Sequence, residues 1–90
     1  MRIKTIQVTS LFEKHYRKLP KQVKEEVKKK ELTFRENPFD PTLRTHKLHG
    51  KDKEAYASWV NYSYRIKFIF LDEESVLFLD VGTHDLIRLI

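Results

Sequence analysis

The sheet of this protein is encoded in YRIKFIFLDEESVLFLDV, residues 64–81. The first seven residues alternate large apolar side chains with Arg65 and Lys67, which is the period-two pattern of a strand with one buried face. Residues 76–81 are nearly continuously apolar, as is typical of a strand in the interior of a sheet. Because the acidic segment 72–75 between them favours a turn, the stretch predicts a hairpin of neighbouring strands.

Two further runs of apolar residues extend this sheet. Residues 2–9 alternate polar and apolar side chains, with Ile6 and Val8 on one face, which predicts an N-terminal strand. Residues 56–62 are expected to form the strand that precedes the hairpin. Both strands are expected at the edges of the sheet, where unpaired backbone groups can accept a strand from another chain.

Pro20 separates two amphipathic stretches that predict a helical hairpin. Thr9 or Ser10 offers an N-cap for the first stretch, whose apolar stripe includes His15, so core packing is the expected role of this imidazole. The second stretch runs from residue 21 to about residue 35. Its apolar stripe consists of Val23, Val27 and Phe34.

The order of one strand, two helices and three strands predicts an α+β fold. We expect an N-terminal strand, a helical hairpin and then a curved, mainly antiparallel sheet, all within a single domain of residues 1–90. The helices would cover one face of the sheet, and the opposite face would expose Arg65 and Lys67. A basic, concave face of this kind is suited to docking RNA.

The composition limits the classes of function. The net charge of +5 favours a polyanionic partner such as nucleic acid, a ribosomal surface or an acidic protein. Without cysteine, neither disulfides nor thiolate zinc sites form, and a cytoplasmic location is the default expectation. The sequence has no apolar run of about 18 residues, which argues against a membrane span, and its N-terminus lacks the apolar core of a signal peptide.

Three of the four histidines gather in two polar segments, each next to one of the two glycines. The first segment is Leu43-Arg44-Thr45-His46-Lys47-Leu48-His49-Gly50, and the second is Gly82-Thr83-His84-Asp85. Because glycine permits backbone bends, both segments are expected at turns or strand ends. This concentration of imidazole predicts a polar site on a basic scaffold.

His46, His49 and His84 are candidates for cleaving RNA without a metal. The 2′-hydroxyl of RNA attacks the adjacent phosphate, and a protein assists by removing that proton and by giving one to the leaving 5′-oxygen. Imidazole titrates near neutral pH and suits both roles. Positive charge is needed at the transition state, and its candidate sources are Arg44, Lys47, Lys51, Lys53 and Arg65.

The same residues have simpler interpretations. Histidines of this kind are more often surface polar groups or satisfied hydrogen-bonding partners than catalytic groups. A metal site is disfavoured because no established ligand spacing is present and the nearby cations oppose a divalent ion, and no cofactor is expected. The aromatic residues that would stack on bases, unless they pack in the core, are Tyr56, Trp59, Tyr62 and Tyr64.

Taken together, these features resemble the RelE/ParE toxin superfamily, and above all its YafQ-like and RelE-like bacterial toxins. The resemblance covers essentially the whole chain: the order of elements, the break Asn37-Pro38-Phe39-Asp40-Pro41, the two histidine segments, and the strand Ser63-Tyr64-Arg65-Ile66. It implies a small α+β toxin that a cognate acidic antitoxin neutralises. For the RelE and YafQ branches, it also implies metal-independent cleavage of mRNA in the ribosomal A site.

The resemblance also implies roles for individual residues. The histidines matched to the family are His46 and His84, and Arg65 matches its strand arginine. With the charges considered above, catalytic roles are expected for His46, His84, Arg65 and Lys47, and RNA-binding roles for Arg44, His49, Lys51 and Lys53. The chain departs from the family pattern at several positions: Trp59 stands where YafQ-like toxins carry a strand histidine, Ala57 and Ser63 replace acidic residues, Ser58 lies near the position of the RelE arginine, and the terminal aromatic is replaced near Arg88.

The expected activity is therefore that of a ribosome-dependent mRNA endonuclease that inhibits translation, with the ribosome, mRNA and an antitoxin as partners. Two alternatives remain open. One is a ParE-like inhibitor of DNA gyrase, which needs no nuclease site. The other is a relative that only binds its antitoxin, which the missing strand histidine would explain.

Overall fold

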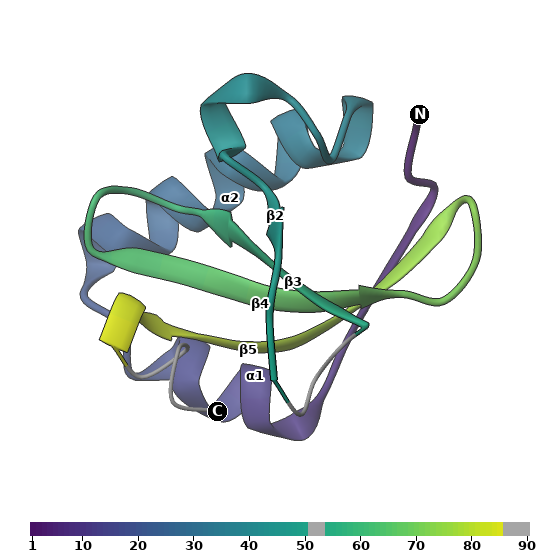
Figure 1. The fold of residues 1–90 in the computed structure, drawn as a ribbon. Helices are drawn as coiled ribbons and strands as arrows, with labels where there is room; N and C mark the ends of the chain where they lie inside the picture. Colours follow the sequence, from purple (N-terminus) through teal and green to yellow (C-terminus); the bar gives the residue numbers. More distant parts are fainter. Residues whose placement is uncertain (51–53, 86–90) are drawn as a thin grey trace.

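Within residues 1–50 and 54–85, which the computed structural model describes, five strands form one mixed sheet (Figure 1). They are β1 (Thr5–Val8), β2 (His46–Lys47), β3 (Ala55–Trp59), β4 (Tyr64–Phe70) and β5 (Ser75–Thr83). Their order across the sheet is β1-β5-β4-β3-β2, with β1 parallel to β5 and every other pair antiparallel. The expected α+β fold and the hairpin of residues 64–81 are confirmed.

Two expectations about the edges of the sheet need correction. The N-terminal strand is shorter than residues 2–9, because Ile3 leaves the sheet to donate its N–H to the carbonyl of Arg35 at 2.8 Å. The run 56–62 is not an edge strand along its first part, because β2 pairs with Tyr56 and Ala57. Among the described residues, the ends of the sheet are therefore β1 and the two-residue strand β2.

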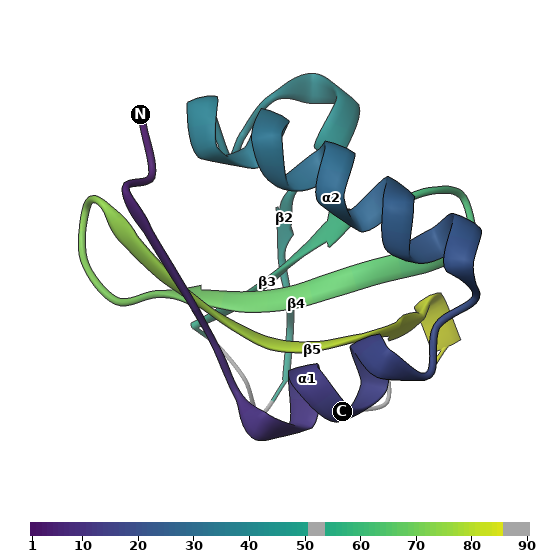
Figure 2. The same ribbon diagram turned by 180° about the vertical axis from the view of Figure 1, so that it is seen from behind.

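The helices α1 (Ser10–Arg17) and α2 (Lys21–Glu36) follow the predicted pattern around Pro20. Figure 2 shows α2 crossing one face of the sheet and α1 running beside β5. Thr9 is the N-cap of α1, and its hydroxyl accepts the N–H of Phe12 at 3.0 Å. In the described part of the chain, no helix is both long and apolar enough to cross a membrane.

The core lies between α2 and the sheet. Phe68 of β4 is fully buried, and its ring meets Phe34 of α2 edge to face with a centroid distance of 4.9 Å. Val23 and Val27 are buried on the same helical stripe as Phe34, as their spacing predicts. This packing fixes the sheet against α2, so the opposite face of the sheet, which we call the open face, is left to carry polar groups.

A β-bulge divides β5 into two halves. Phe78 pairs with Phe68 and Asp80 pairs with Lys67, so Leu79 is an additional residue with no partner on β4. Phe78 therefore points to the helices, whereas Asp80 lies on the open face. Val81 returns to the core.

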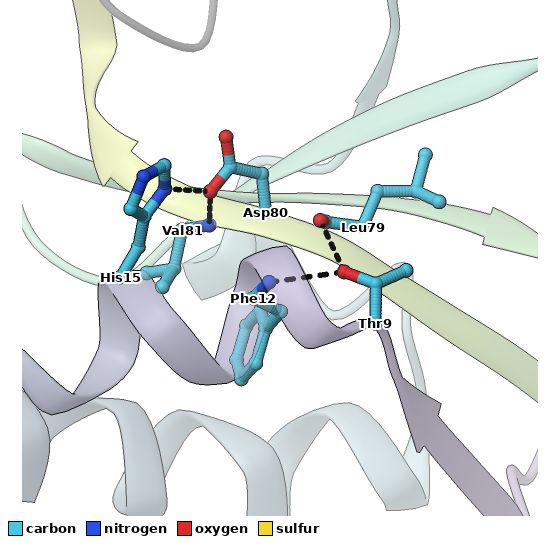
Figure 3. A network of polar contacts seen from close by, with 6 residues as sticks. All are labelled: Thr9, Phe12, His15, Leu79, Asp80 and Val81. Carbon is cyan, nitrogen blue, oxygen red and sulfur yellow. Dashed lines mark hydrogen bonds and ion pairs between the residues drawn. The ribbon is translucent and has the colours of Figure 1, made fainter.

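The second half of β5 is covered by α1 rather than by β1 (Figure 3). The Thr9 hydroxyl donates to the carbonyl of Leu79 at 2.7 Å, which ties the start of α1 to the bulge. Further along α1, His15 Nδ1 lies 2.6 Å from Asp80 Oδ1. This oxygen also accepts the N–H of Val81 at 2.8 Å. The expectation that His15 packs in the core is wrong, because its ring is the partner of a buried carboxylate.

Arg65 and Lys67 do lie on the open face, but they are not exposed there. The exposed fractions are 5% for Arg65 and 3% for Lys67. Figure 1 shows the chain at β2 passing in front of β4, and Trp59 of β3 lies against the Arg65 guanidinium at 3.9 Å. The expected bare basic surface is therefore wrong: period-two alternation tells which face a side chain occupies, but not whether another strand covers that face.

Candidate functional site

Strand pairing places residues of the two histidine segments in neighbouring rows on the open face. His46 pairs with Ala57, which pairs with Lys67, which pairs with Asp80, so these four residues form one row across the sheet. The next row on this face contains Trp59, Arg65 and Gly82. We call these two rows, together with Arg44 and His84, the candidate site.

Arg65 forms the buried base of this site. Its Nη1 donates to the carbonyls of Asn61, Tyr62 and Tyr64 at 2.7, 3.0 and 3.1 Å, so the guanidinium organises the β3–β4 turn. Within the described residues its Nε has no hydrogen-bond partner. Burial lowers the pKa of Arg65 from its ordinary value, and the charge of Arg44 lowers that pKa further. Arg65 is thus committed to the turn, and its Nη1 is not available to a phosphate.

Trp59 links the two guanidinium groups. The Arg65 guanidinium lies 3.9 Å from the centroid of the indole, and that of Arg44 lies 4.6 Å from it. Both distances are within the range of cation–π interactions. Because β3 lies between β4 and the segment that carries Arg44, the indole of Trp59 contacts two cations, the buried Arg65 and the exposed Arg44.

Arg44 is held in place by its backbone as well as by Trp59. It adopts a left-handed conformation (φ 48°, ψ 37°) at the end of the short 3-10 helix η1 (Pro41–Leu43). That helix is capped by Asp40, which accepts the hydroxyl and the N–H of Thr42 at 2.6 and 2.9 Å, and these bonds lower the pKa of Asp40. Within the described residues the Arg44 guanidinium has no carboxylate partner, so its N–H groups face solvent and suit a phosphate.

His46 is oriented by the same residue. Its Nδ1 lies 3.0 Å from the carbonyl oxygen of Arg44. Because a carbonyl only accepts hydrogen bonds, Nδ1 carries the proton in this contact, and Nε2 is left as the basic nitrogen of the neutral ring. The exposed imidazole of His46 therefore has the tautomer that a general base needs.

His84 follows β5 at the opposite side of the candidate site. Its N–H donates to the carbonyl of Ser63 at 2.9 Å, which attaches it to the β3–β4 turn. Its Nδ1 lies 4.0 Å from Asp85 Oδ1, and both side chains are more than half exposed.

The structure brings some of the sequence-predicted residues together and leaves others at the rim. His46 lies on β2 and His84 follows β5, and β3 and β4 separate these two strands, which at about 4.8 Å per strand spacing places their backbones about 14 Å apart across the sheet. Lys47 and His49 are exposed beside His46. Lys51, Lys53 and Arg88 lie outside the described residues. The described residues contain no group of three or more His, Cys, Asp or Glu side chains placed to hold a metal.

Sequence reasoning missed the pair of His15 and Asp80. Asp80 is 1% exposed, and within the described residues its Oδ2 has no hydrogen-bond partner. A single acidic residue inside the apolar run 76–81 was the available signal, because a buried carboxylate needs a partner from elsewhere in the chain. The partner is 65 positions away in sequence, beyond the reach of any local pattern.

Comparison with solved structures identifies the fold. The YoeB/ParE toxin from Agrobacterium tumefaciens matches with a TM-score of 0.77 and 10% identity, over 90% of this chain and 99% of that chain. YafQ from E. coli strain BL21(DE3) matches with a TM-score of 0.67 and 16% identity, over 97% and 98% of the two chains. The archaeal RelE–RelB complex from Pyrococcus horikoshii OT3 matches with a TM-score of 0.71 and 15% identity, over 92% and 96%.

The chain has the RelE/ParE toxin fold. No protein-family model matches the sequence, and no curated protein matches it either. At such low identities the RelE/ParE likeness concerns the arrangement of helices and strands, and it assigns no chemistry to the residues of the candidate site.

Proposed function

We propose that this protein is the toxin of a type II toxin–antitoxin system and that it cleaves mRNA on the ribosome without a metal. The observation that carries the proposal is a RelE/ParE fold in which His46 of β2, the exposed Arg44 just before it, and His84 just after β5 surround the same rows of paired strands. Two exposed imidazoles and an exposed guanidinium supply the proton transfers and the positive charge that metal-independent RNA cleavage needs.

In the proposed reaction, Nε2 of His46 takes the proton of the 2′-hydroxyl as the 2′-oxygen forms its bond to phosphorus. The bond from phosphorus to the 5′-oxygen breaks, and the imidazolium of His84 gives its proton to that oxygen. The products are a cyclic phosphate and a free 5′-hydroxyl. The scissile phosphate would lie between the two histidines, beside the exposed Arg44.

Positive charge at the phosphate is assigned to Arg44 and Lys47. Arg44 is exposed and held over Trp59, and Lys47 is exposed next to His46. Arg65 is assigned a positioning role instead, because its Nη1 already donates to three carbonyls of the β3–β4 turn. RNA binding is assigned to His49, and also to Lys51 and Lys53, which lie outside the described residues.

The test is a reconstituted translation reaction in which mRNA ends are mapped by primer extension. We expect cuts at specific codons on translated mRNA and none on the same mRNA without ribosomes. Breaks in DNA that require gyrase would instead show a ParE-like inhibitor. An absence of both activities, from a folded protein that binds an acidic neighbour-encoded partner, would identify the protein as an antitoxin-binding relative.

The antitoxin is assigned to the groove between α1 and α2. This groove has a volume of about 500 Å³ and an apolar floor that includes Phe12, Val27 and Phe78. Its charged lining residues are Arg17, Lys28, Glu13 and Glu31. An acidic, amphipathic segment matches both the floor and the net charge of +5. The RelE of Pyrococcus horikoshii was solved as a complex with RelB, which supports a bound partner as the resting state.

Co-expression with an acidic adjacent reading frame is expected to give a stable complex that no longer blocks translation. A partner at about 100 times its Kd stabilises the folded toxin by about 2.7 kcal/mol, so the complex should melt well above the free protein. Val8→Glu, at the end of the groove, should weaken the complex, whereas Leu71→Glu on the β4–β5 turn should not. Equal weakening by both variants would place the partner elsewhere.

A further inference from the structure

Tyr62 is the most exposed of the large apolar side chains in the described residues. Its exposed fraction is 84%, although it occupies the turn next to the candidate site. The described exposed apolar residues do not gather around it; the others lie in α1, α2, the N-terminal strand and the remaining turns. Tyr62 therefore does not belong to an apolar docking patch, and its exposure needs another explanation.

The turn that presents Tyr62 is fixed from several directions. Asn61 Oδ1 accepts the N–H groups of Ser63 and Tyr64 at 2.8 and 2.9 Å, and Asn61 Nδ2 donates to Glu26 of α2 at 3.0 Å. The carbonyl of Tyr62 itself accepts from Arg65 at 3.0 Å. The exposed ring is thus carried by a rigid backbone, which lowers the entropy that binding would cost.

The surroundings of the ring are aromatic and cationic. The Tyr62 and Trp59 rings meet edge to face, with a centroid distance of 6.1 Å and an interplanar angle of 88°. Trp59 in turn contacts the guanidiniums of Arg44 and Arg65. Ser63, the next residue, binds the backbone of His84. The turn therefore places one exposed π face beside a phosphate-binding cation and a candidate proton donor.

We infer that Tyr62 stacks on a nucleobase of single-stranded RNA, next to the phosphate that Arg44 holds. Every base offers a π face, and stacking on an exposed aromatic ring beside cations is how single strands are commonly bound. This inference rests on the proposed function, since it adds a base-stacking subsite to the same site. The subsite sets how the RNA strand lies on the open face, and it takes no part in proton transfer.

Trp59 provides a binding signal that does not depend on cleavage. It is the sole tryptophan of the chain and lies against Tyr62, so a stacked base should quench its fluorescence. Titration with a short single-stranded RNA that carries a 2′-O-methyl group at each position, which removes the attacking hydroxyl, should give a Kd for binding without reaction. Tyr62→Ala should raise this Kd roughly ten- to a hundred-fold, while Tyr62→Phe and the control Leu71→Ala, which removes another exposed apolar side chain, should leave it within about two-fold.

The outcomes separate this inference from the proposed function. If Tyr62→Ala weakens RNA binding but the parent protein cuts no mRNA during translation, the stacking subsite stands and the nuclease proposal fails. If the parent cuts mRNA and Tyr62→Ala changes neither its Kd nor its cut positions, the stacking subsite is wrong. Quenching by polyglutamate with a Kd equal to that for RNA would also overturn it, because the turn would then be a contact for an acidic protein.

Discussion

Replacing His84 or His46 with alanine is expected to slow mRNA cleavage on ribosomes by about 10²–10⁴-fold, the range for the loss of one general acid or base. Both imidazoles are exposed, and the contact that attaches His84 to the β3–β4 turn uses its backbone N–H. The fold should therefore survive either change. The measurement is the rate of codon-specific cutting in reconstituted translation, together with thermal melting of each variant.

The pH dependence of the two variants tests their separate roles. A general base supports cleavage when neutral, so the rising limb of the pH–rate profile should disappear with His46→Ala. A general acid supports cleavage when protonated, so the falling limb should disappear with His84→Ala. Gln7→Ala on the distant strand β1 is a matched exposed change and should behave like the parent. If His46→Ala and His84→Ala both cut mRNA as fast as the parent, neither histidine takes part in the reaction.

Replacing Asp80 with alanine is expected to lower the free energy of unfolding by about 1–3 kcal/mol, the usual cost of leaving buried hydrogen-bonding groups without their partner. The change removes a carboxylate that lies 2.6 Å from His15 and directly opposite the buried Lys67. Because small domains are stable by only about 5–15 kcal/mol, such a loss is a large share of the total. Denaturant unfolding followed by Trp59 fluorescence measures it.

A charge-matched control separates this effect from a general change in net charge. Glu73→Ala also removes one carboxylate, but from the exposed β4–β5 turn, and it should change the free energy of unfolding by less than about 0.5 kcal/mol. His15→Gln, which keeps a donor for Asp80, should fall between the two. If Asp80→Ala is as mild as Glu73→Ala, the contact between α1 and β5 does not stabilise the fold.

Patterns confined to one element predicted the architecture well. The alternation that ends at Phe70, the stripe of Val23, Val27 and Phe34, and the cap at Thr9 each report on a single strand or helix and its buried side. Such signals are local, because the spacing of apolar residues is set by the geometry of the element itself. The order of those elements was then enough to predict the helical hairpin on one face of the sheet.

The candidate site was harder to predict because its contacts join distant elements. The alternation placed Arg65 on the correct face but gave no sign that Trp59 covers it or that three turn carbonyls bind it. Likewise, no spacing rule connects His15 with Asp80. The two histidine segments were predicted to lie at the edges of this face, and the separation between the strands beside them follows only from the strand order.

The bulge at Leu79 has a consequence for comparing this chain with its relatives. If β5 formed an unbroken ladder, odd and even positions would keep their sides, and Phe78 and Asp80 would both face the helices. The unpaired residue shifts the phase, so the core aromatic and the carboxylate lie on opposite sides of the sheet. Two relatives with identical residues after Leu79 can therefore differ in which of those side chains face the core. Alignments of this strand should count paired positions rather than positions along the chain.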